Sequence, residues 1–190
     1  IDSTYKYLQL WNGIFNLTFI SILENTLKNY VLTPGPVPVP EFVMLEMAKP
    51  IIHHRTEEFE EIFHNATEGL KKVFMTKEEV LILASSGTGA MDASICNTLS
   101  KGDKALVVNG GKFGERWLKI CSAYGVETEE LKVEWGKAVS SEDIKNALDN
   151  NPDIKAVLVQ ASETSTGVKH PIKKIASITK NKDNVLLIVD

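Results

Sequence analysis

The sequence predicts an α/β fold in which a mostly parallel sheet is flanked by helices. From residue 79 onward, short apolar runs alternate with segments that have helical spacing. Strands that alternate with helices predict crossover connections and parallel pairing. Glycine-rich or hydroxyl-rich turns follow three of the apolar runs, at the strand ends where open α/β sheets bind ligands. The 190 residues are enough for about one domain.

The N-terminal part has a different character from the rest. Its apolar stretch at 8–23 is interrupted by polar residues and a glycine and falls short of the ~20 apolar residues of a membrane-spanning helix. It also lacks the basic region and cleavage site of a signal peptide. We therefore interpret residues 1–28 as an N-terminal extension without an assigned role, and we expect no membrane interaction. The four prolines within 31–40 predict an extended loop.

Two helices are predicted before the alternating region. A short helix is expected at 41–48, directly after Pro40. The segment 51–74 begins as a loop and becomes an amphipathic helix, because its apolar residues recur at intervals of three or four. These residues are Phe59, Ile62, Phe63, Ala66, Leu70 and Phe74.

The alternating region predicts five strands and four helices. The strands are expected at 79–85, 105–109, 126–134, 154–160 and 185–190, and the helices at 87–99, 113–125, 140–150 and 171–181. Gly125 is expected to end its helix, and Ser140 is expected to form a capping box with Asp143. The last strand has no following helix to cover it, so we expect residues 29–190 to be an incomplete domain.

Charge and composition exclude several kinds of site. The net charge of −4 and the lack of Lys/Arg blocks argue against nucleic-acid binding. The four histidines do not have the spacing of a metal-ligand set, so no metal is expected. Two cysteines outside any CxxC motif are typical of a reducing cytoplasm, and we expect a cytoplasmic protein.

The turn SSGTG at 85–89 predicts a phosphate site. Gly87 and Gly89 let backbone amides approach an anion closely. The helix that follows offers its unpaired N–H groups and the positive end of its dipole. Ser86 and Thr88 add hydroxyl donors. A plain glycine-rich connection between a strand and a helix would explain the same residues.

Three further strand ends carry chemically distinctive residues. Phe113 follows a Gly-Gly turn, Thr164 lies in a run of hydroxyl residues, and Asp190 ends the last apolar strand. Each has a simpler explanation: core packing for Phe113, a solvated turn for Thr164, and a helix cap for Asp190. Together, a phosphate cup, an aromatic side chain, hydroxyl groups and a carboxylate describe a site for a flat, phosphorylated ring that contains nitrogen.

The order of these motifs resembles the class V family of pyridoxal-phosphate (PLP) aminotransferases, especially the serine–pyruvate and alanine–glyoxylate group. The resemblance covers residues 29–190 and rests on TPGPVPVP, HHRTEEF, SSGTGAMDA, NGGKFGERW, ETSTGV and LIVD. It implies the PLP-dependent transferase fold type I, here as an incomplete large domain. It also implies a homodimer with active sites at the subunit interface.

The resemblance also implies roles for individual residues. It assigns the cofactor contacts to four strand ends: Ser86, Gly87 and Thr88 at the phosphate, Phe113 against the pyridine ring, Thr164 at the ring hydroxyl, and Asp190 at the ring nitrogen. It places five residues near the substrate entrance: Pro34, Gly35, Pro36, His54 and Arg55.

The implied activity is transfer of an amino group between a small amino acid, alanine or serine, and a 2-oxo acid, glyoxylate or pyruvate. The cofactor lysine and the substrate-binding arginine are expected after Asp190, so we expect this chain alone to be inactive. Other class V activities are alternatives: cysteine desulfurase, phosphoserine aminotransferase or lyase. A non-catalytic protein that retains the PLP fold is a further alternative.

Overall fold

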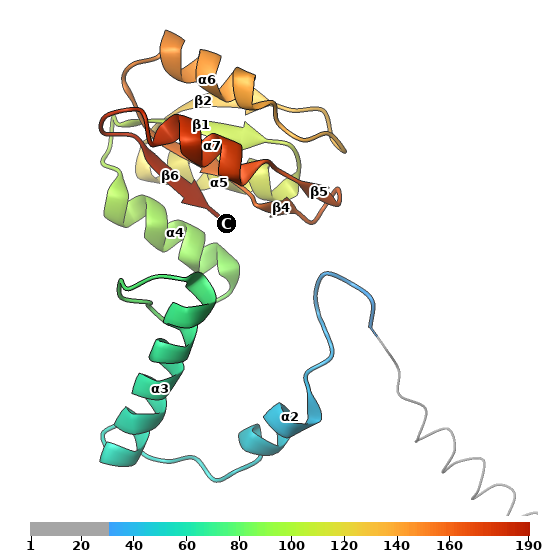
Figure 1. Ribbon diagram of the computed structural model, residues 1–190, viewed down its shortest axis with the longest axis vertical. Coiled ribbons are helices and arrows are strands. Elements are labelled where there is room, and N and C mark those ends of the chain that lie inside the picture. The colour runs from blue at the N-terminus through green and yellow to red at the C-terminus, as the bar shows by residue number, and fades with distance from the viewer. Residues whose placement is uncertain (1–30) are drawn as a thin grey trace, which may run out of the picture. The chain divides into compact units, whose positions relative to one another are not determined.

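The computed structural model describes residues 31–190 (Figure 1), so the predicted extension at 1–28 lies outside the described residues. The chain divides into two compact units, Ile1–His53 and His54–Asp190. In the first unit, residues 31–40 form neither helix nor strand, and α2 (Glu41–Met47) follows Pro40 directly. Both features agree with the predicted proline-rich loop and short helix.

The second unit begins with α3 (Glu57–Phe74), which confirms the predicted amphipathic helix. The Thr56 hydroxyl caps it by accepting a hydrogen bond from the Phe59 backbone N–H at 3.3 Å. The apolar side of α3 is largely uncovered within the described part of the chain. Phe63 and Phe74 keep 46% and 64% of their surface exposed.

The prediction of a strand at 79–85 is wrong, because this segment does not join the sheet. Leu81 is 82% exposed, and Ile82 and Leu83 are about half exposed. Apolar residues with β propensity form a strand only where a neighbouring strand completes their hydrogen bonds. Among residues 31–190, no strand pairs with this segment.

The other four predicted strands form one parallel sheet (Figure 1), in the order β2-β1-β3-β6. These strands are β1 (Lys104–Asn109), β2 (Glu127–Lys132), β3 (Ile154–Val159) and β6 (Leu186–Val189). Val107 pairs with Leu158, which pairs in turn with Ile188, so the three apolar strands align at this level; the pairing of β1 with β3 shifts register once, between Lys104 and Ala105. A short antiparallel hairpin of β4 (Ser162–Glu163) and β5 (Val168–Lys169) was not predicted.

The helices confirm the predicted alternation with small shifts at their ends. They are α4 (Gly87–Thr98), α5 (Lys112–Tyr124), α6 (Ser141–Asn150) and α7 (Ile172–Thr179). Gly125 ends α5 in the left-handed conformation, with φ of 67°. The predicted capping box is only half correct: the Ser140 hydroxyl accepts from the Glu142 N–H at 3.2 Å, one residue before Asp143.

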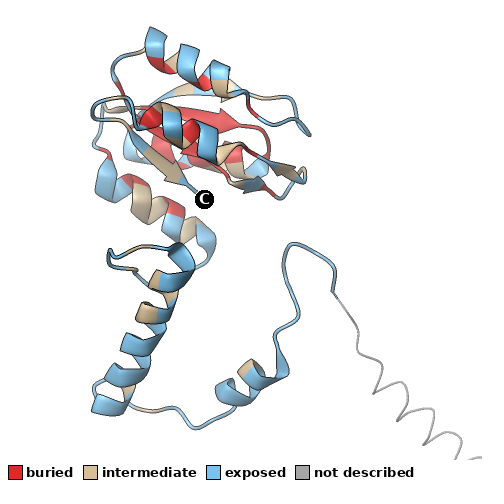
Figure 2. Ribbon diagram, in the orientation of Figure 1, coloured by how far each residue is buried: buried red, intermediate tan, exposed pale blue. Residues whose placement is uncertain are grey.

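Helices cover both faces of the sheet and create two separate cores. The side chains of β1 and β3 alternate between the faces, and both strands are buried along most of their length (Figure 2), with Lys104 and Lys155 near their starts reaching solvent. One core joins α4 and α5 to Val107 and Leu158, with Trp117 at its centre. The other joins α6 and α7 to Val108 and Val157. This three-layer arrangement fixes the carboxyl ends of β1, β3 and β6 at one edge.

Candidate functional site

The carboxyl ends of β3 and β6 bring the predicted aspartate beside the predicted hydroxyl turn. The Asp190 backbone N–H donates to the Val159 carbonyl at 3.1 Å, and the Ala161 N–H donates to the Asp190 carbonyl at 2.7 Å. These bonds extend the pairing of β3 and β6 beyond their last strand residues. Asp190 is therefore bonded to Ala161, the residue immediately before the hydroxyl-rich segment 162–166.

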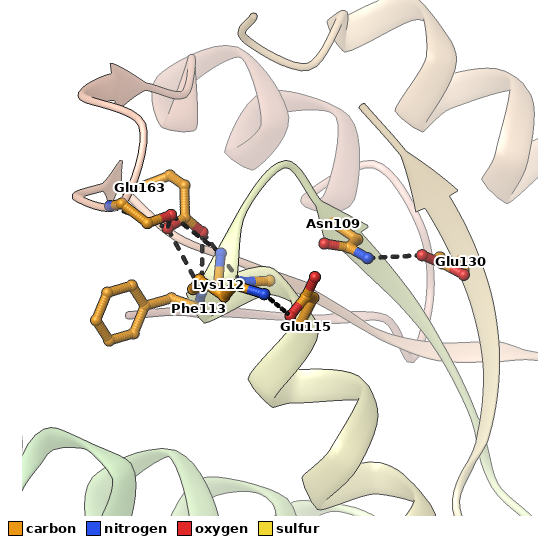
Figure 3. A network of polar contacts seen from close by, with 8 residues as sticks. Asn109, Lys112, Phe113, Glu115, Glu130 and Glu163 are labelled. Carbon is orange, nitrogen blue, oxygen red and sulfur yellow. Dashed lines mark hydrogen bonds and ion pairs between the residues drawn. The ribbon is translucent and has the colours of Figure 1, made fainter. Parts of the chain in front are cut away.

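A buried carboxylate connects this turn to the start of α5. Glu163 is fully buried and accepts hydrogen bonds from the backbone N–H groups of Phe113 at 3.2 Å and Gly114 at 3.0 Å. The N–H and hydroxyl of Ser165 donate to its other oxygen. The Ser165 hydroxyl also accepts from the Lys112 N–H at 3.0 Å. Figure 3 shows the Glu163 side chain pointing at the first turn of α5.

Two glycines make this close approach possible. A Cβ atom added at Gly111 would lie 2.5 Å from the Glu163 carboxyl carbon and 2.5 Å from the Ser165 hydroxyl oxygen. A Cβ atom at Gly114 would lie 2.7 Å from the Val108 carbonyl oxygen. Both distances are below any normal contact, so side chains at these positions would push α5 away from the strand ends. The predicted glycine turn after β1 therefore serves packing as well as flexibility.

An arginine connects the predicted phosphate cup to the predicted stacking residue. The Arg116 guanidinium donates to the Thr88 hydroxyl at 2.8 Å. Its central carbon lies 4.8 Å from the centre of the half-buried Phe113 ring. Arg116 is one helical turn after Phe113 on α5, so the two side chains lie on the same side of the helix. The cation thus lies beside the first turn of α4.

The first turn of α4 is suited to an anion. No side chain caps this end of the helix, although Ser86 occupies the N-cap position. A Cβ atom at Gly87 would meet nothing within 4 Å, so the backbone there is open to a ligand. A helix N-terminus without a side-chain cap, the positive end of its dipole and the nearby Arg116 charge all favour a phosphate dianion. The residues present therefore fit the phosphate of the implied PLP cofactor.

A buried histidine lies beneath the turn that follows β1. A Cβ atom added at Gly110 would lie 3.5 Å from Nε2 of His170, which is only 3% exposed. Nδ1 of His170 accepts a hydrogen bond from the Val139 backbone N–H at 3.1 Å. Burial lowers the pKa of His170, and the Glu163 charge opposes that shift. His170 therefore acts here as a neutral hydrogen-bond acceptor.

An amide–carboxylate hydrogen bond links the end of β1 to β2. The Asn109 amide donates to a carboxyl oxygen of Glu130 at 2.7 Å (Figure 3). On the outer side of α5, Lys112 pairs with Glu115 at 2.9 Å and lowers the pKa of that carboxyl through this hydrogen bond. Both side-chain contacts stabilise the region at the strand ends, and neither involves Glu163. Among residues 31–190, no group of acidic, histidine or cysteine side chains could hold a metal ion.

The structure brings most of the predicted cofactor residues into one connected region. Thr88 is tied to α5 through Arg116, Phe113 is tied to the hydroxyl turn through Glu163, and the backbone of Asp190 is bonded beside that turn. Thr164 itself is exposed in the turn. The specific contacts of these residues with a cofactor stay predictions.

The predicted entrance residues are divided between the two units of the chain. Pro34, Gly35 and Pro36 belong to the separate unit Ile1–His53. His54 and Arg55 lie before α3, in a shallow hollow that Phe59 and Phe63 also line. Their role near a substrate stays a prediction.

Sequence reasoning missed two residues, Glu163 and Arg116. Arg116 could have been found, because a cation one helical turn after a candidate aromatic residue shares its face of the helix. Glu163 had no such local signal, because its partners on α5 lie about 50 residues earlier in the chain. Within the described residues, no helix is long and apolar enough to cross a membrane.

Comparison with known proteins places these features in a family. The family model for aminotransferase class-V matches residues 41–190. A protein of Synechococcus named soluble hydrogenase, small subunit, is 46% identical over 86% of this chain and 43% of its own length. The L-aspartate–glyoxylate aminotransferase of Paracoccus denitrificans is 36% identical over 87% of this chain and 43% of its own length.

A solved structure shows the same architecture. The crystal structure of a subgroup IV aspartate aminotransferase from Thermus thermophilus superposes with a TM-score of 0.79 at 36% identity. The match covers 85% of this chain and 45% of that protein. The chain thus spans less than half the length of the relatives it matches.

Proposed function

The chain belongs to the class V aminotransferases, and we propose that the protein that carries it transfers an amino group from alanine or serine to glyoxylate or pyruvate. The observation that carries this proposal is the connected region at the strand ends. It joins a helix N-terminus without a side-chain cap, a half-buried aromatic ring and a carboxylate at the end of a strand. The name of the Paracoccus relative supports glyoxylate as the acceptor and adds aspartate as a donor to test.

Pyridoxal 5'-phosphate supplies an electron sink for the negative charge that develops when an amino acid loses its α-proton. In this proposal Ser86, Gly87 and Thr88 bind the phosphate. Phe113 packs against the ring and excludes water from one face. Thr164 donates a hydrogen bond to the ring hydroxyl.

Asp190 has the central electrostatic role in the proposal. A carboxylate beside the ring nitrogen favours the protonated, positively charged nitrogen. The proton held there increases the electron-withdrawing power of the ring. Asp190 suits this role because two backbone hydrogen bonds fix its position at the end of a strand.

The proposal extends to the subunits and the substrate entrance. We expect a homodimer, with Pro34, Gly35, Pro36, His54 and Arg55 near the entrance for the amino and 2-oxo acids. An arginine and a histidine would suit the substrate carboxylate. Sedimentation of the full-length protein tests the dimer, and a raised KM for R55A with little change in kcat would support the entrance role.

The first test of the function measures amino transfer by the full-length protein with PLP. Alanine, serine and aspartate are supplied as donors, and glyoxylate and pyruvate as acceptors. We expect D190N to lower kcat by about a hundredfold or more, because a fixed charge at the reacting ring is lost. D183N is the matched control, since Asp183 is exposed in the turn before β6.

Two results would contradict the proposal. One is the absence of transfer with every pair of substrates, and the other is wild-type turnover by D190N. Release of sulfide from cysteine would instead identify the desulfurase alternative.

A further inference from the structure

We propose that Glu163 is a positioning residue that sets Phe113 and the turn carrying Thr164 against the cofactor ring. The inference rests on the proposed function, because it concerns the same site. Glu163 does not need to touch the cofactor in this role. It would act through the backbone of α5 on one side and through Ser165 on the other.

The first argument is that this carboxylate is buried and fully occupied by donors. Glu163 has 0% exposed surface, which would be costly for an acidic side chain without hydrogen-bond partners. Backbone N–H groups of α5 reach Oε2, and Ser165 reaches Oε1. A carboxylate that only accepts hydrogen bonds matches these neighbours, each of which donates to it.

The second argument is that Glu163 does the work of a missing helix cap. The N-cap position of α5 is Gly111, which has no side chain to satisfy the first N–H groups. Glu163 supplies the acceptor from a hairpin about 50 residues further along the chain. Its negative charge also lies at the positive end of the α5 dipole. The start of α5 is therefore positioned by β4 rather than by its own sequence.

The third argument is that this contact sets the direction of Phe113. Glu163 binds the N–H of Phe113 itself and of Gly114, so it fixes the backbone from which the ring projects. Thr164 lies between Glu163 and Ser165, and Ser165 donates to the Glu163 carboxylate through both its N–H and its hydroxyl. One side chain thus controls the two residues that are proposed to contact the ring plane and the ring hydroxyl.

The replacement E163Q tests the inference with little change of shape. Glutamine keeps one acceptor oxygen, but its NH₂ group would face N–H or hydroxyl donors. At least one of the present bonds must then be lost, because a backbone N–H cannot accept from the NH₂ group, and the start of α5 should shift or loosen. The matched control is E115Q, which removes a carboxylate from the same first turn of α5 but lies outside the buried network.

The measurement is binding of pyridoxamine 5'-phosphate to the full-length protein, because this probe needs no lysine. Tryptophan fluorescence gives the Kd, and circular dichroism of the bound ring reports its orientation. We expect E163Q to raise the Kd about tenfold and to reduce the ring signal at saturation. E115Q should change neither.

A double-mutant cycle shows whether Glu163 acts through Phe113. If it does, E163Q should cost clearly less affinity in an F113A background than in the wild type, because the residue being positioned is gone. A loss that is equal in both backgrounds would overturn the positioning role. So would wild-type affinity and wild-type ring dichroism in E163Q.

Failure of the proposed function and failure of E163Q to fold give different results. If the wild type does not bind pyridoxamine 5'-phosphate, the proposed function itself fails. If E163Q does not fold by far-ultraviolet circular dichroism, S165A decides, because it removes only the hydroxyl that bridges Glu163 and Lys112. S165A should weaken the ring dichroism and raise the Kd a few fold, and unchanged values would overturn the inference.

Discussion

The absence of a side chain at Gly111 lets Glu163 and Ser165 pack closely against the start of α5. We predict that G111A destabilises the protein by about 1–3 kcal/mol, as overpacking of a tight interior does. The added methyl would collide with Glu163, and buried hydrogen bonds prevent that side chain from moving aside. The free energy of unfolding from urea titration measures the effect.

The neighbouring glycine provides the control for this prediction. A methyl at Gly110 would make only ordinary contact with His170, at 3.5 Å. G110A should therefore change the free energy of unfolding by no more than about 0.5 kcal/mol. Equal losses for the two variants would show that the clash with Glu163 is not the cause.

Individual site residues differ in how well the sequence could predict them. Phe113 and Asp190 could be selected because each directly follows an apolar strand or its turn, where parallel sheets bind ligands. Glu163 follows a strand too, but nothing in its neighbourhood distinguishes a buried carboxylate from a solvated one. Its burial depends on the packing of α5, which is a tertiary contact.

At the scale of elements, local sequence patterns predicted a strand correctly where neighbouring strands within the described chain pair with it. The apolar residues of β3 predicted a buried strand correctly, because β1 and β6 lie on either side of it. The equally apolar segment 79–85 failed, since no neighbouring strand completes its hydrogen bonds. Helices satisfy their own backbone groups, and even α3 forms although its apolar side is largely exposed.

Helix α6 allows a clean test of capping. We predict that S140A lowers the free energy of unfolding by about 1 kcal/mol, because the hydroxyl that accepts from the Glu142 N–H is lost. The control is S177A, which removes an exposed hydroxyl that bonds only to a carbonyl within α7. That variant should be neutral within about 0.5 kcal/mol. Chemical denaturation of both variants gives the comparison, and equal effects would argue against a capping role.

On the scale of the whole molecule, His170 links two parts of the second unit. Its backbone N–H donates to the Ala161 carbonyl, and its ring accepts from Val139 in the loop before α6. A proton on Nδ1 would replace the acceptor with a donor and break the contact to Val139. The direction of the pKa shift agrees with this geometry, since burial favours the neutral ring.

Stability should therefore depend on pH through His170. Because folding lowers its pKa below the ordinary value of 6.5, the unfolded chain takes up the proton first on acidification. The free energy of unfolding should be highest above pH 6.5 and fall as the pH drops towards the folded pKa. The slope contributed by this residue is at most about 1.4 kcal/mol per pH unit. Urea titrations at several pH values should show that H170N removes this component, whereas H64N, at an exposed position on α3, retains it. An unchanged slope in H170N would mean that other groups control the acid sensitivity of the fold.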